Sequence, residues 1–320
     1  MKFLILPPQT DVTRTWARQL RRELPELDLA VAETPAEVAR LIGDADGAFG
    51  TLPADLLALA GKLRWLQAPF AAPPAGYYHR DLIEHSVIVT NMRGLFNDHV
   101  GTHAMAFVLC FARGFQHYIP LQQRCSWSPL PGEGGVVHLP EATAVIVGAG
   151  GIGAEIGRML STFGTNVIGT DARRTSPPPG FSELHPAGAL DQFLPRADFV
   201  ILTVPDTPAT HGFMDRSRFS LMKRTSYFIN IGRGRTTRLD DLVAALRAGE
   251  IAGAGLDVFE DEPLPADHPL WMLPNVILTP HTGWHGPYLD QRRFEVILAN
   301  CRALLANGTF MNIVDKSSWF

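Results

Sequence analysis

The sequence predicts an α/β protein with two Rossmann-like or flavodoxin-like domains, each built on a parallel sheet, and a cleft between them. Short apolar runs alternate with helix-forming segments over residues 2–95 and again over residues 143–305, which is the pattern of parallel sheets covered by helices. A glycine-rich turn joins one such strand to its helix near the middle of the chain. A length of 320 residues is enough for two domains.

The first half of the chain alternates strands and helices. The expected strands are FLIL, DLAVA, GAFG, RWLQAP and SVIVTN, and the expected helices surround Trp16 to Leu24, Pro35 to Leu41, Ala54 to Ala60 and Tyr78 to Glu84. A last helix, from about Tyr288 to Leu305, should return the chain to this domain. We therefore expect a discontinuous substrate domain of residues 1–96 and 287–320, and a dinucleotide-binding domain of residues 97–286.

The second domain should begin with one long helix, Asn97 to Tyr118, that carries the chain across, followed by a Pro- and Gly-rich loop, Ser126 to Glu141. After the glycine turn, the expected strands are DFVILTVP, YFINIG, GAGLDVF and NVILTP, and the expected helices lie around Leu190 to Leu194, Arg216 to Lys223 and Leu239 to Glu250.

The stretch from Thr143 to Asp171 predicts a dinucleotide site. Gly148 allows a tight turn, Gly150 lets the backbone approach a pyrophosphate, and Gly153 lets the helix pack closely on the strand. The helix N-terminus, with Gly151 and Ile152, offers N–H groups and a positive dipole end to phosphates. Asp171 ends the next strand, where a carboxylate can accept bonds from the adenosine ribose.

Bulk properties exclude several classes of partner. A formal charge of −4 gives no reason to expect nucleic acid or an anionic membrane surface. The three cysteines form no CxxC pair, which indicates a reducing compartment and no structural metal. The N-terminal apolar run is stopped by Pro7 and Pro8, so we expect a buried strand there and a cytoplasmic protein.

Three motifs follow strands on the side expected to face the cofactor: NIGRG (230–234), DVFEDEP (257–263) and TPH (279–281). Arg233 offers a planar fork of donors that suits a substrate carboxylate. His281 can transfer a proton near neutral pH, and a carboxylate from Glu262 beside it would favour the imidazolium. These groups predict hydride transfer between a nicotinamide and a 2-oxo or 2-hydroxy acid. Glu260 and Asp261 are alternatives to Glu262 for the carboxylate beside His281, and only the spacing to Pro263 favours Glu262.

The motifs together resemble those of the D-isomer-specific 2-hydroxyacid dehydrogenase family, over essentially the whole chain. The resemblance implies that Arg233 binds substrate, Glu262 and His281 form the acid/base pair, and Asp257 holds the nicotinamide carboxamide. It also implies homodimerisation through the nucleotide domain and substrate-carboxylate binding by backbone amides of Ala71 and Ala72. The cofactor site is expected to comprise Gly148, Gly150, Gly151, Ile152, Gly153, Asp171, Arg173, Arg174, Val204, Pro205, Ile231 and Asp257.

The chain departs from the usual family pattern in ways that affect substrate choice. Phe70 to Pro74 replaces a turn with a central Gly, Gly101-Thr102-His103 replaces an Ala-Glu-aromatic run, and Trp284 stands where smaller residues are frequent. We expect Trp284 to lie over the substrate side chain and to favour substrates larger than glyoxylate, although packing explains such residues more often.

Several alternatives remain open at this level. Asp171 favours NAD by repelling the extra phosphate of NADP, yet Arg173 and Arg174 could clamp that phosphate. An NADPH-preferring glyoxylate or hydroxypyruvate reductase is one rival, and a binding protein that senses NAD(H) is another. The pairs His99/His103 and His281/His285 have i, i+4 spacing, but we expect no metal site.

Overall fold

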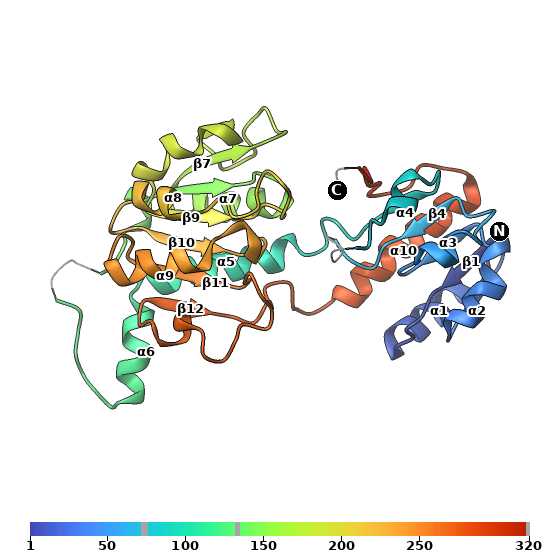
Figure 1. Ribbon diagram of the computed structural model, residues 1–320, viewed down its shortest axis with the longest axis horizontal. Helices are drawn as coiled ribbons and strands as arrows, with labels where there is room; N and C mark the ends of the chain where they lie inside the picture. The colour runs from blue at the N-terminus through green and yellow to red at the C-terminus, as the bar shows by residue number, and fades with distance from the viewer. Residues whose placement is uncertain (72–75, 132–134, 318–320) are drawn as a thin grey trace. The chain divides into compact units, whose positions relative to one another are not determined.

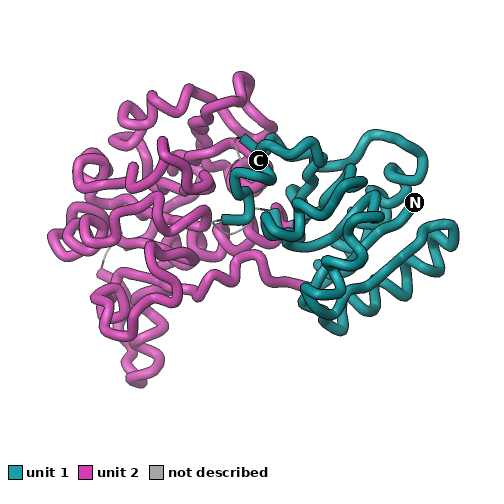
Figure 2. Tube along the Cα trace, turned by 45° about the vertical axis from the view of Figure 1, so that its right-hand side comes forward, with its two compact units in different colours: residues 1–95, 287–320 teal, residues 96–286 magenta. Residues whose placement is uncertain are grey.

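The computed structural model describes residues 1–71, 76–131 and 135–317 (Figure 1). The chain forms two compact units, unit 1 with residues 1–95 and 287–320 and unit 2 with residues 96–286 (Figure 2). Each unit has its own sheet, and every strand pair in both sheets is parallel. The predicted fold class, two parallel-sheet α/β domains, is confirmed.

Unit 1 has a five-stranded sheet in the order β2-β1-β3-β4-β5, which is the flavodoxin-like order. Its strands are β1 (Lys2–Ile5), β2 (Asp28–Val31), β3 (Gly47–Phe49), β4 (Trp65–Gln67) and β5 (Ile88–Thr90). Its helices are α1 (Asp11–Glu23), α2 (Pro35–Leu41), α3 (Ala54–Leu57), α4 (Arg80–Glu84) and α10 (Leu289–Ala306), with a 3-10 turn, η1 (Ile42–Asp44). The N-terminal run forms β1, as expected.

A buried polar network joins the C-terminal part of the chain to the sheet of unit 1. The Asn300 amide in α10 donates to Gln67 Oε1 of β4 at 2.9 Å and accepts from the backbone N–H of Met311 at 2.7 Å. The hydroxyl of Thr90 in β5 donates to the same Gln67 oxygen at 2.8 Å. Since buried polar groups are costly when unpaired, this network specifies where α10 packs.

Unit 2 has a seven-stranded sheet in the order β12-β11-β10-β9-β6-β7-β8. Its strands are β6 (Thr143–Val147), β7 (Asn166–Asp171), β8 (Glu183–Pro186), β9 (Phe199–Leu202), β10 (Tyr227–Asn230), β11 (Gly253–Leu256) and β12 (Val276–Leu278). Its α-helices are α5 (Asn97–Ala112), α6 (Phe115–Gln123), α7 (Gly151–Thr162), α8 (Arg216–Leu221) and α9 (Leu239–Ala248). Its 3-10 turns are η2 (Leu139–Glu141), η3 (Ala187–Gln192), η4 (Leu194–Arg196), η5 (Gly234–Thr236) and η6 (Pro269–Met272).

The strand order of unit 2 changes direction between β6 and β9, because β7 and β8 continue from one side of β6 and β9 to β12 from the other. Ligands of open α/β sheets bind at such a switch point, outside the carboxyl ends of the strands. The glycine turn after β6 and the three motifs after β10, β11 and β12 all lie at this end of the sheet.

The structure corrects two expectations about unit 2 and contains one strand that was not expected. The single helix predicted over Asn97 to Tyr118 is two helices, because Gly114 takes a left-handed φ of 71° that ends α5 before α6 begins. The segment Leu190 to Leu194 forms 3-10 turns, not an α-helix. The unexpected strand is β8, a half-buried edge strand with little apolar character.

Within the described ranges, no helix combines the length and the apolar character that crossing a bilayer requires.

Candidate active site

Arg233 lies in a loop whose conformation is held by hydrogen bonds with Asn230, the last residue of β10. The buried Asn230 amide donates to the backbone carbonyl of Arg233 at 3.1 Å and to the hydroxyl of Thr237 at 3.0 Å, and it accepts from the N–H of Gly232 at 3.0 Å. Gly234 packs against backbone, since a Cβ there would come within 1.9 Å of the Phe259 carbonyl. The NIGRG and DVFEDEP loops therefore touch backbone to backbone, which requires glycine at position 234.

The half-buried guanidinium of Arg233 is one of the charged groups at this end of the sheet. Its Nη1 donates to the Gly232 carbonyl at 2.6 Å, which orients the planar fork. Burial lowers the pKa of Arg233, and the carboxylates of Glu262 and Asp206 oppose that shift. A partly desolvated arginine is a strong site for an anion, because its attraction is less screened than in water.

His281 and Glu262 form a hydrogen-bonded pair. Nδ1 of His281 lies 2.7 Å from Oε2 of Glu262, and Oε1 of Glu262 accepts from the Phe259 N–H at 3.0 Å. The two side chains are 41% and 35% exposed, so ligands can reach them. Because a carboxylate accepts at Nδ1, that nitrogen carries a proton, and Nε2 is the one available to exchange a proton with a substrate.

The structure distinguishes the three acids of the DVFEDEP motif. Glu262 contacts His281, as described, whereas the Glu260 carboxylate accepts from the backbone N–H of Leu239 at 2.9 Å, at the start of α9. For Asp261 the structure gives an exposed position. The geometry thus favours Glu262 as the partner of the histidine.

Asp257, the residue after β11, is buried and holds the turn that carries His281. Its carboxylate accepts from the N–H groups of Thr282 at 2.8 Å and Gly283 at 2.9 Å, and its backbone carbonyl accepts from the His281 N–H at 2.8 Å. His281 has a φ of 53°, in the left-handed region that residues other than glycine rarely adopt. The backbone N–H groups of residues 281, 282 and 283 therefore all donate to Asp257.

Hydrogen bonds decide the charge state of Asp257. Burial acts to raise the pKa of the carboxyl group, but donors from His103, Thr279, Gly283 and Thr282 outweigh it and lower that pKa below its usual range. A carboxylate that receives several hydrogen bonds is stabilised in its charged form.

The glycine turn after β6 meets the ends of β9 and β10. A Cβ on Gly148, which has a φ of 97°, would come within 2.8 Å of Thr203 Oγ1 and 2.9 Å of Val204. A Cβ on Gly232 would come within 2.7 Å of the Val204 carbonyl. Gly148 and Val204, both predicted cofactor residues, thus lie together with Gly232 of the NIGRG motif at the switch point.

The N-terminus of α7 has the features of a phosphate cradle. Gly150 is its N-cap and makes no side-chain cap, and a Cβ placed there would meet nothing within 4 Å. Gly153, in contrast, is covered, since its Cβ would lie 1.9 Å from the Gly148 carbonyl. The open space beside Gly150, next to free helix N–H groups and the positive dipole end, suits the pyrophosphate of a dinucleotide.

Asp171 ends β7 with its carboxylate fixed by backbone donors. Oδ2 accepts from the Ala149 N–H at 2.8 Å, and Oδ1 accepts from the N–H groups of Arg173 and Arg174, both at 2.8 Å. One side chain therefore connects the glycine turn to the loop that carries the two exposed arginines.

The structure describes two of three further residues that were predicted to bind substrate. Ala71 belongs to unit 1, where its carbonyl accepts from the Asn91 amide at 3.0 Å, and Ala72 lies outside the described residues. Trp284 is 40% exposed, its indole N–H donates to the His281 carbonyl at 3.0 Å, and its ring meets Phe96 edge to face. The indole thus donates a hydrogen bond to the histidine turn, and its contact with substrate stays a prediction.

The sequence did not predict the contacts of Thr203, of Thr279 in the TPH motif or of His103. The Thr203 hydroxyl donates to the Gly148 carbonyl at 2.6 Å, and the Thr279 hydroxyl donates to Asp257 Oδ1 at 2.6 Å. Nε2 of His103 lies 2.9 Å from the Thr279 hydroxyl and 3.4 Å from Asp257. These contacts join residues far apart in sequence, so no local pattern could have revealed them. Over the described residues, no group of three His, Cys, Asp or Glu side chains could hold a metal ion.

Comparison with known proteins places these features in a family. Residues 105–283 match the model of the D-isomer specific 2-hydroxyacid dehydrogenase NAD binding domain. The chain is 35% identical over 213 residues to a glyoxylate/hydroxypyruvate reductase A of Serratia proteamaculans, a match that covers 67% of this chain and 66% of that protein. It is 36% identical over 258 residues to a glyoxylate/hydroxypyruvate reductase B of Citrobacter koseri, covering 78% of each.

The fold is similar to that of a solved structure over nearly the full length of both chains. The D-isomer specific 2-hydroxyacid dehydrogenase of Xanthobacter autotrophicus Py2, in complex with NADPH and MES, aligns with a TM-score of 0.85 at 27% identity and covers 99% of each chain. The predicted use of NAD(P) and the predicted hydride-transfer chemistry are confirmed by these comparisons.

The two glycines of the turn give a matched test of the cradle. We expect Gly153→Ala to lower the free energy of unfolding by roughly 1–3 kcal/mol, because its Cβ would collide with backbone. Gly150→Ala should leave the melting temperature unchanged and weaken NAD(P)H binding about tenfold or more, because its methyl group would occupy the space for phosphate. Thermal unfolding and NAD(P)H fluorescence titration measure the two effects. Unchanged cofactor affinity in Gly150→Ala would contradict the assignment.

Proposed function

Because the chain belongs to the D-isomer specific 2-hydroxyacid dehydrogenase family, we propose that it reduces a small 2-oxo acid to the corresponding 2-hydroxy acid, with D configuration where the product is chiral. The observation that carries the proposal is the His281–Glu262 hydrogen bond of 2.7 Å, in the same cluster of strand-end loops as Arg233. Relatives named glyoxylate/hydroxypyruvate reductases support glyoxylate or hydroxypyruvate as substrate.

The residues divide the chemistry among them. Bound NAD(P)H supplies the hydride. Arg233 binds the substrate carboxylate and polarises the carbonyl group, because its fork of donors fits a planar anion. His281 gives its Nε2 proton to the carbonyl oxygen, and Glu262 stabilises the imidazolium that exists before this transfer. The backbone amides of Ala71 and Ala72 remain a predicted second contact for the carboxylate.

The position of Asp171 favours NAD(H) over NADP(H). Three backbone N–H groups hold its carboxylate, so the negative charge cannot swing away from an added 2′-phosphate as a mobile side chain could. Arg173 and Arg174 are exposed in the adjoining loop and support residual use of NADP(H), the cofactor class bound by the Xanthobacter relative.

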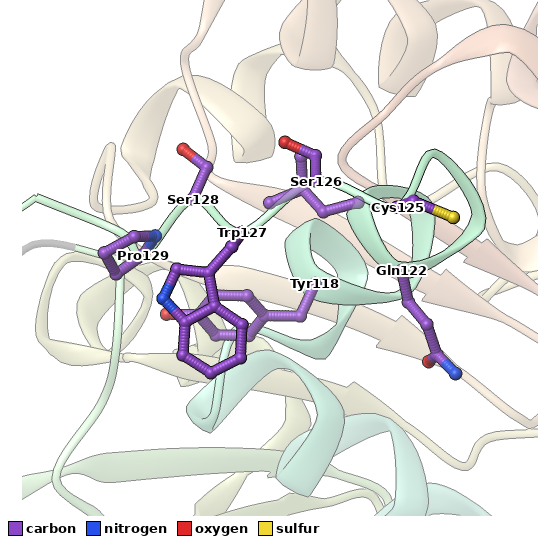
Figure 3. A pocket seen from close by; sticks show the side chains of 8 residues that line it. Tyr118, Gln122, Cys125, Ser126, Trp127, Ser128 and Pro129 are labelled. Atoms are coloured by element: carbon purple, nitrogen blue, oxygen red, sulfur yellow. The ribbon is translucent and has the colours of Figure 1, made fainter.

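An exposed apolar surface on α6 and the segment after it supports a homodimer. No residue of α6 is buried, and Phe115, Ile119 and Trp127 around it are 49%, 50% and 100% exposed. Figure 1 shows α6 extending beyond the edge strand β12 of unit 2, and Figure 3 shows Trp127 with Tyr118 at an open pocket of about 480 Å³. Apolar surface of this kind marks association sites, and a second copy of the chain fits the family resemblance.

The three cysteines, Cys110, Cys125 and Cys301, are all unpaired. Unpaired thiols and a nicotinamide-dependent reaction support the cytoplasmic location that we propose.

Substitution of the two central side chains should separate proton transfer from binding. We expect His281→Ala to lower kcat by about a hundredfold to ten-thousandfold with little change in KM for the 2-oxo acid, because only proton transfer is lost. Arg233→Ala should raise KM by about tenfold or more and lower kcat as well. Steady-state oxidation of NAD(P)H with glyoxylate and hydroxypyruvate measures both.

If His281→Ala keeps near-wild-type kcat, the acid/base role is wrong. If the wild type binds NADH tightly but reduces none of glyoxylate, hydroxypyruvate, pyruvate and phenylpyruvate, the NAD(H)-sensing protein becomes the better hypothesis.

Cofactor choice has its own test. The ratio of kcat/KM for NADPH to that for NADH should rise about tenfold or more in Asp171→Ser, because a fixed negative charge beside the 2′-phosphate is removed. Arg174→Ser should lower the same ratio and serves as the opposite control. A ratio that is unchanged in Asp171→Ser would refute the assignment of NAD(H) preference to this carboxylate.

Light scattering tests the dimer. The wild type should show twice the 35.1 kDa of a single chain, and Trp127→Glu should shift the protein toward the monomer at micromolar concentration. Leu59→Glu changes an apolar residue that is 50% exposed in unit 1 and should leave the mass unchanged. A monomeric wild type, or a dimer insensitive to Trp127→Glu, would contradict this interface.

A further inference from the structure

His103 connects helix α5 to the histidine turn that follows β12. It lies in the middle of a largely apolar helix, its side chain is only 21% exposed, and its ring meets Phe107 edge to face at 5.0 Å. Its Nε2 reaches the hydroxyl of Thr279, a residue 176 positions later, at 2.9 Å. A polar ring in such a place needs its hydrogen bond, because a buried polar group without a partner is costly.

The direction of the hydrogen bonds follows from their donors. The Thr279 hydroxyl has one proton and gives it to Asp257 Oδ1 at 2.6 Å, so toward His103 it acts as an acceptor. Nε2 of His103 is therefore the donor, and it also lies 3.4 Å from Asp257 Oδ1. The three side chains form a directed chain of hydrogen bonds that ends on one carboxylate oxygen.

That carboxylate determines the conformation of the turn at 281–283. The same Oδ1 accepts from the Thr282 N–H, and Oδ2 accepts from the Gly283 N–H. A Cβ on Gly283 would come within 2.9 Å of Asp257 Oδ2 and 3.2 Å of the His103 ring, so the turn packs directly on both residues. Because residues other than glycine rarely adopt a left-handed φ, the turn at His281 depends on contacts of this kind.

We propose that His103 is a positioning residue for His281: through Thr279 it fixes the orientation of the Asp257 carboxylate, which in turn holds the 281–283 turn so that the His281 imidazole meets Glu262. The inference rests on the proposed reductase function, because its main readout is turnover. It adds a residue on α5 that contacts neither His281 nor Glu262 and acts on them through the turn.

Three substitutions test the chain of contacts. His103→Phe keeps an aromatic ring against Phe107 but removes the donor, His103→Gln keeps an N–H donor near the position of Nε2, and Thr279→Val removes the connecting hydroxyl with little change of shape. His138→Phe is the matched control, because His138 is exposed and lies outside the turn and its contacts.

We expect His103→Phe and Thr279→Val each to lower kcat for glyoxylate about tenfold or more, with a modest fall in melting temperature because each variant leaves a buried polar group short of a partner. His103→Gln should restore most of kcat, and the double variant should be no worse than either single variant, because both remove one connection. His138→Phe should behave like the wild type.

Amide hydrogen exchange gives a readout that does not need turnover. The N–H groups of residues 281–283 should exchange faster in His103→Phe than in the wild type and the His138→Phe control, and His103→Gln should restore their protection. Inactivity of the wild type toward all 2-oxo acids would count against the proposed function alone, since the exchange arm would still test the positioning role.

The proposal is overturned if His103→Phe keeps kcat within about twofold of the wild type and leaves exchange at 281–283 unchanged. It is also overturned if kcat falls while exchange at residues 281–283 stays at the wild-type rate, because His103 would then not act through the turn. Failure of His103→Gln to restore either readout would assign the loss to packing against Phe107.

Discussion

The buried carboxylate of Asp257 is the constraint on which the candidate site depends. It follows β11 directly and accepts hydrogen bonds from N–H groups of the loop after the neighbouring strand β12, so it joins the two strands at their carboxyl ends. Its own N–H is bonded to the Asn230 carbonyl of β10. The loops that carry His281 and Arg233 are thereby both connected to Asp257. Because the strands are parallel, their carboxyl ends lie at the same edge of the sheet, and motifs that are far apart in the sequence form one cluster there.

Rigid support of this kind suits hydride transfer. The reaction needs a proton donor and an anion-binding group in fixed positions, since misplacement by an ångström is costly in rate. Asn230 fixes the arginine loop, Glu262 is fixed by the Phe259 N–H, and the histidine turn is held by Asp257 and by the indole of Trp284. The reactive side chains remain partly exposed while the backbone that carries them is hydrogen-bonded.

The sequence predicted most of the fold because its strands are short apolar runs with turn residues at their ends, as in β6 and β9. It missed β8, whose edge position leaves it half-buried and therefore without an apolar pattern. It also joined α5 to α6, since the apolar character continues through Gly114 while the backbone does not. For the site, motif spacing selected Arg233, Glu262 and His281, but the choice among three adjacent acids and the contact of His103 with Thr279 depend on tertiary packing, which a linear pattern does not contain.

In the proposed reaction His281 is the proton donor, and Glu262, not a neighbouring acid, is its partner. The most direct measurement is the single-turnover rate of NAD(P)H oxidation by glyoxylate in Glu262→Gln, with Glu260→Gln and Asp261→Asn alongside. Glu262→Gln should slow this step by about tenfold or more, while Glu260→Gln and Asp261→Asn should stay close to the wild-type rate. A wild-type rate in Glu262→Gln, or an equal loss in Asp261→Asn, would refute the pairing of Glu262 with His281.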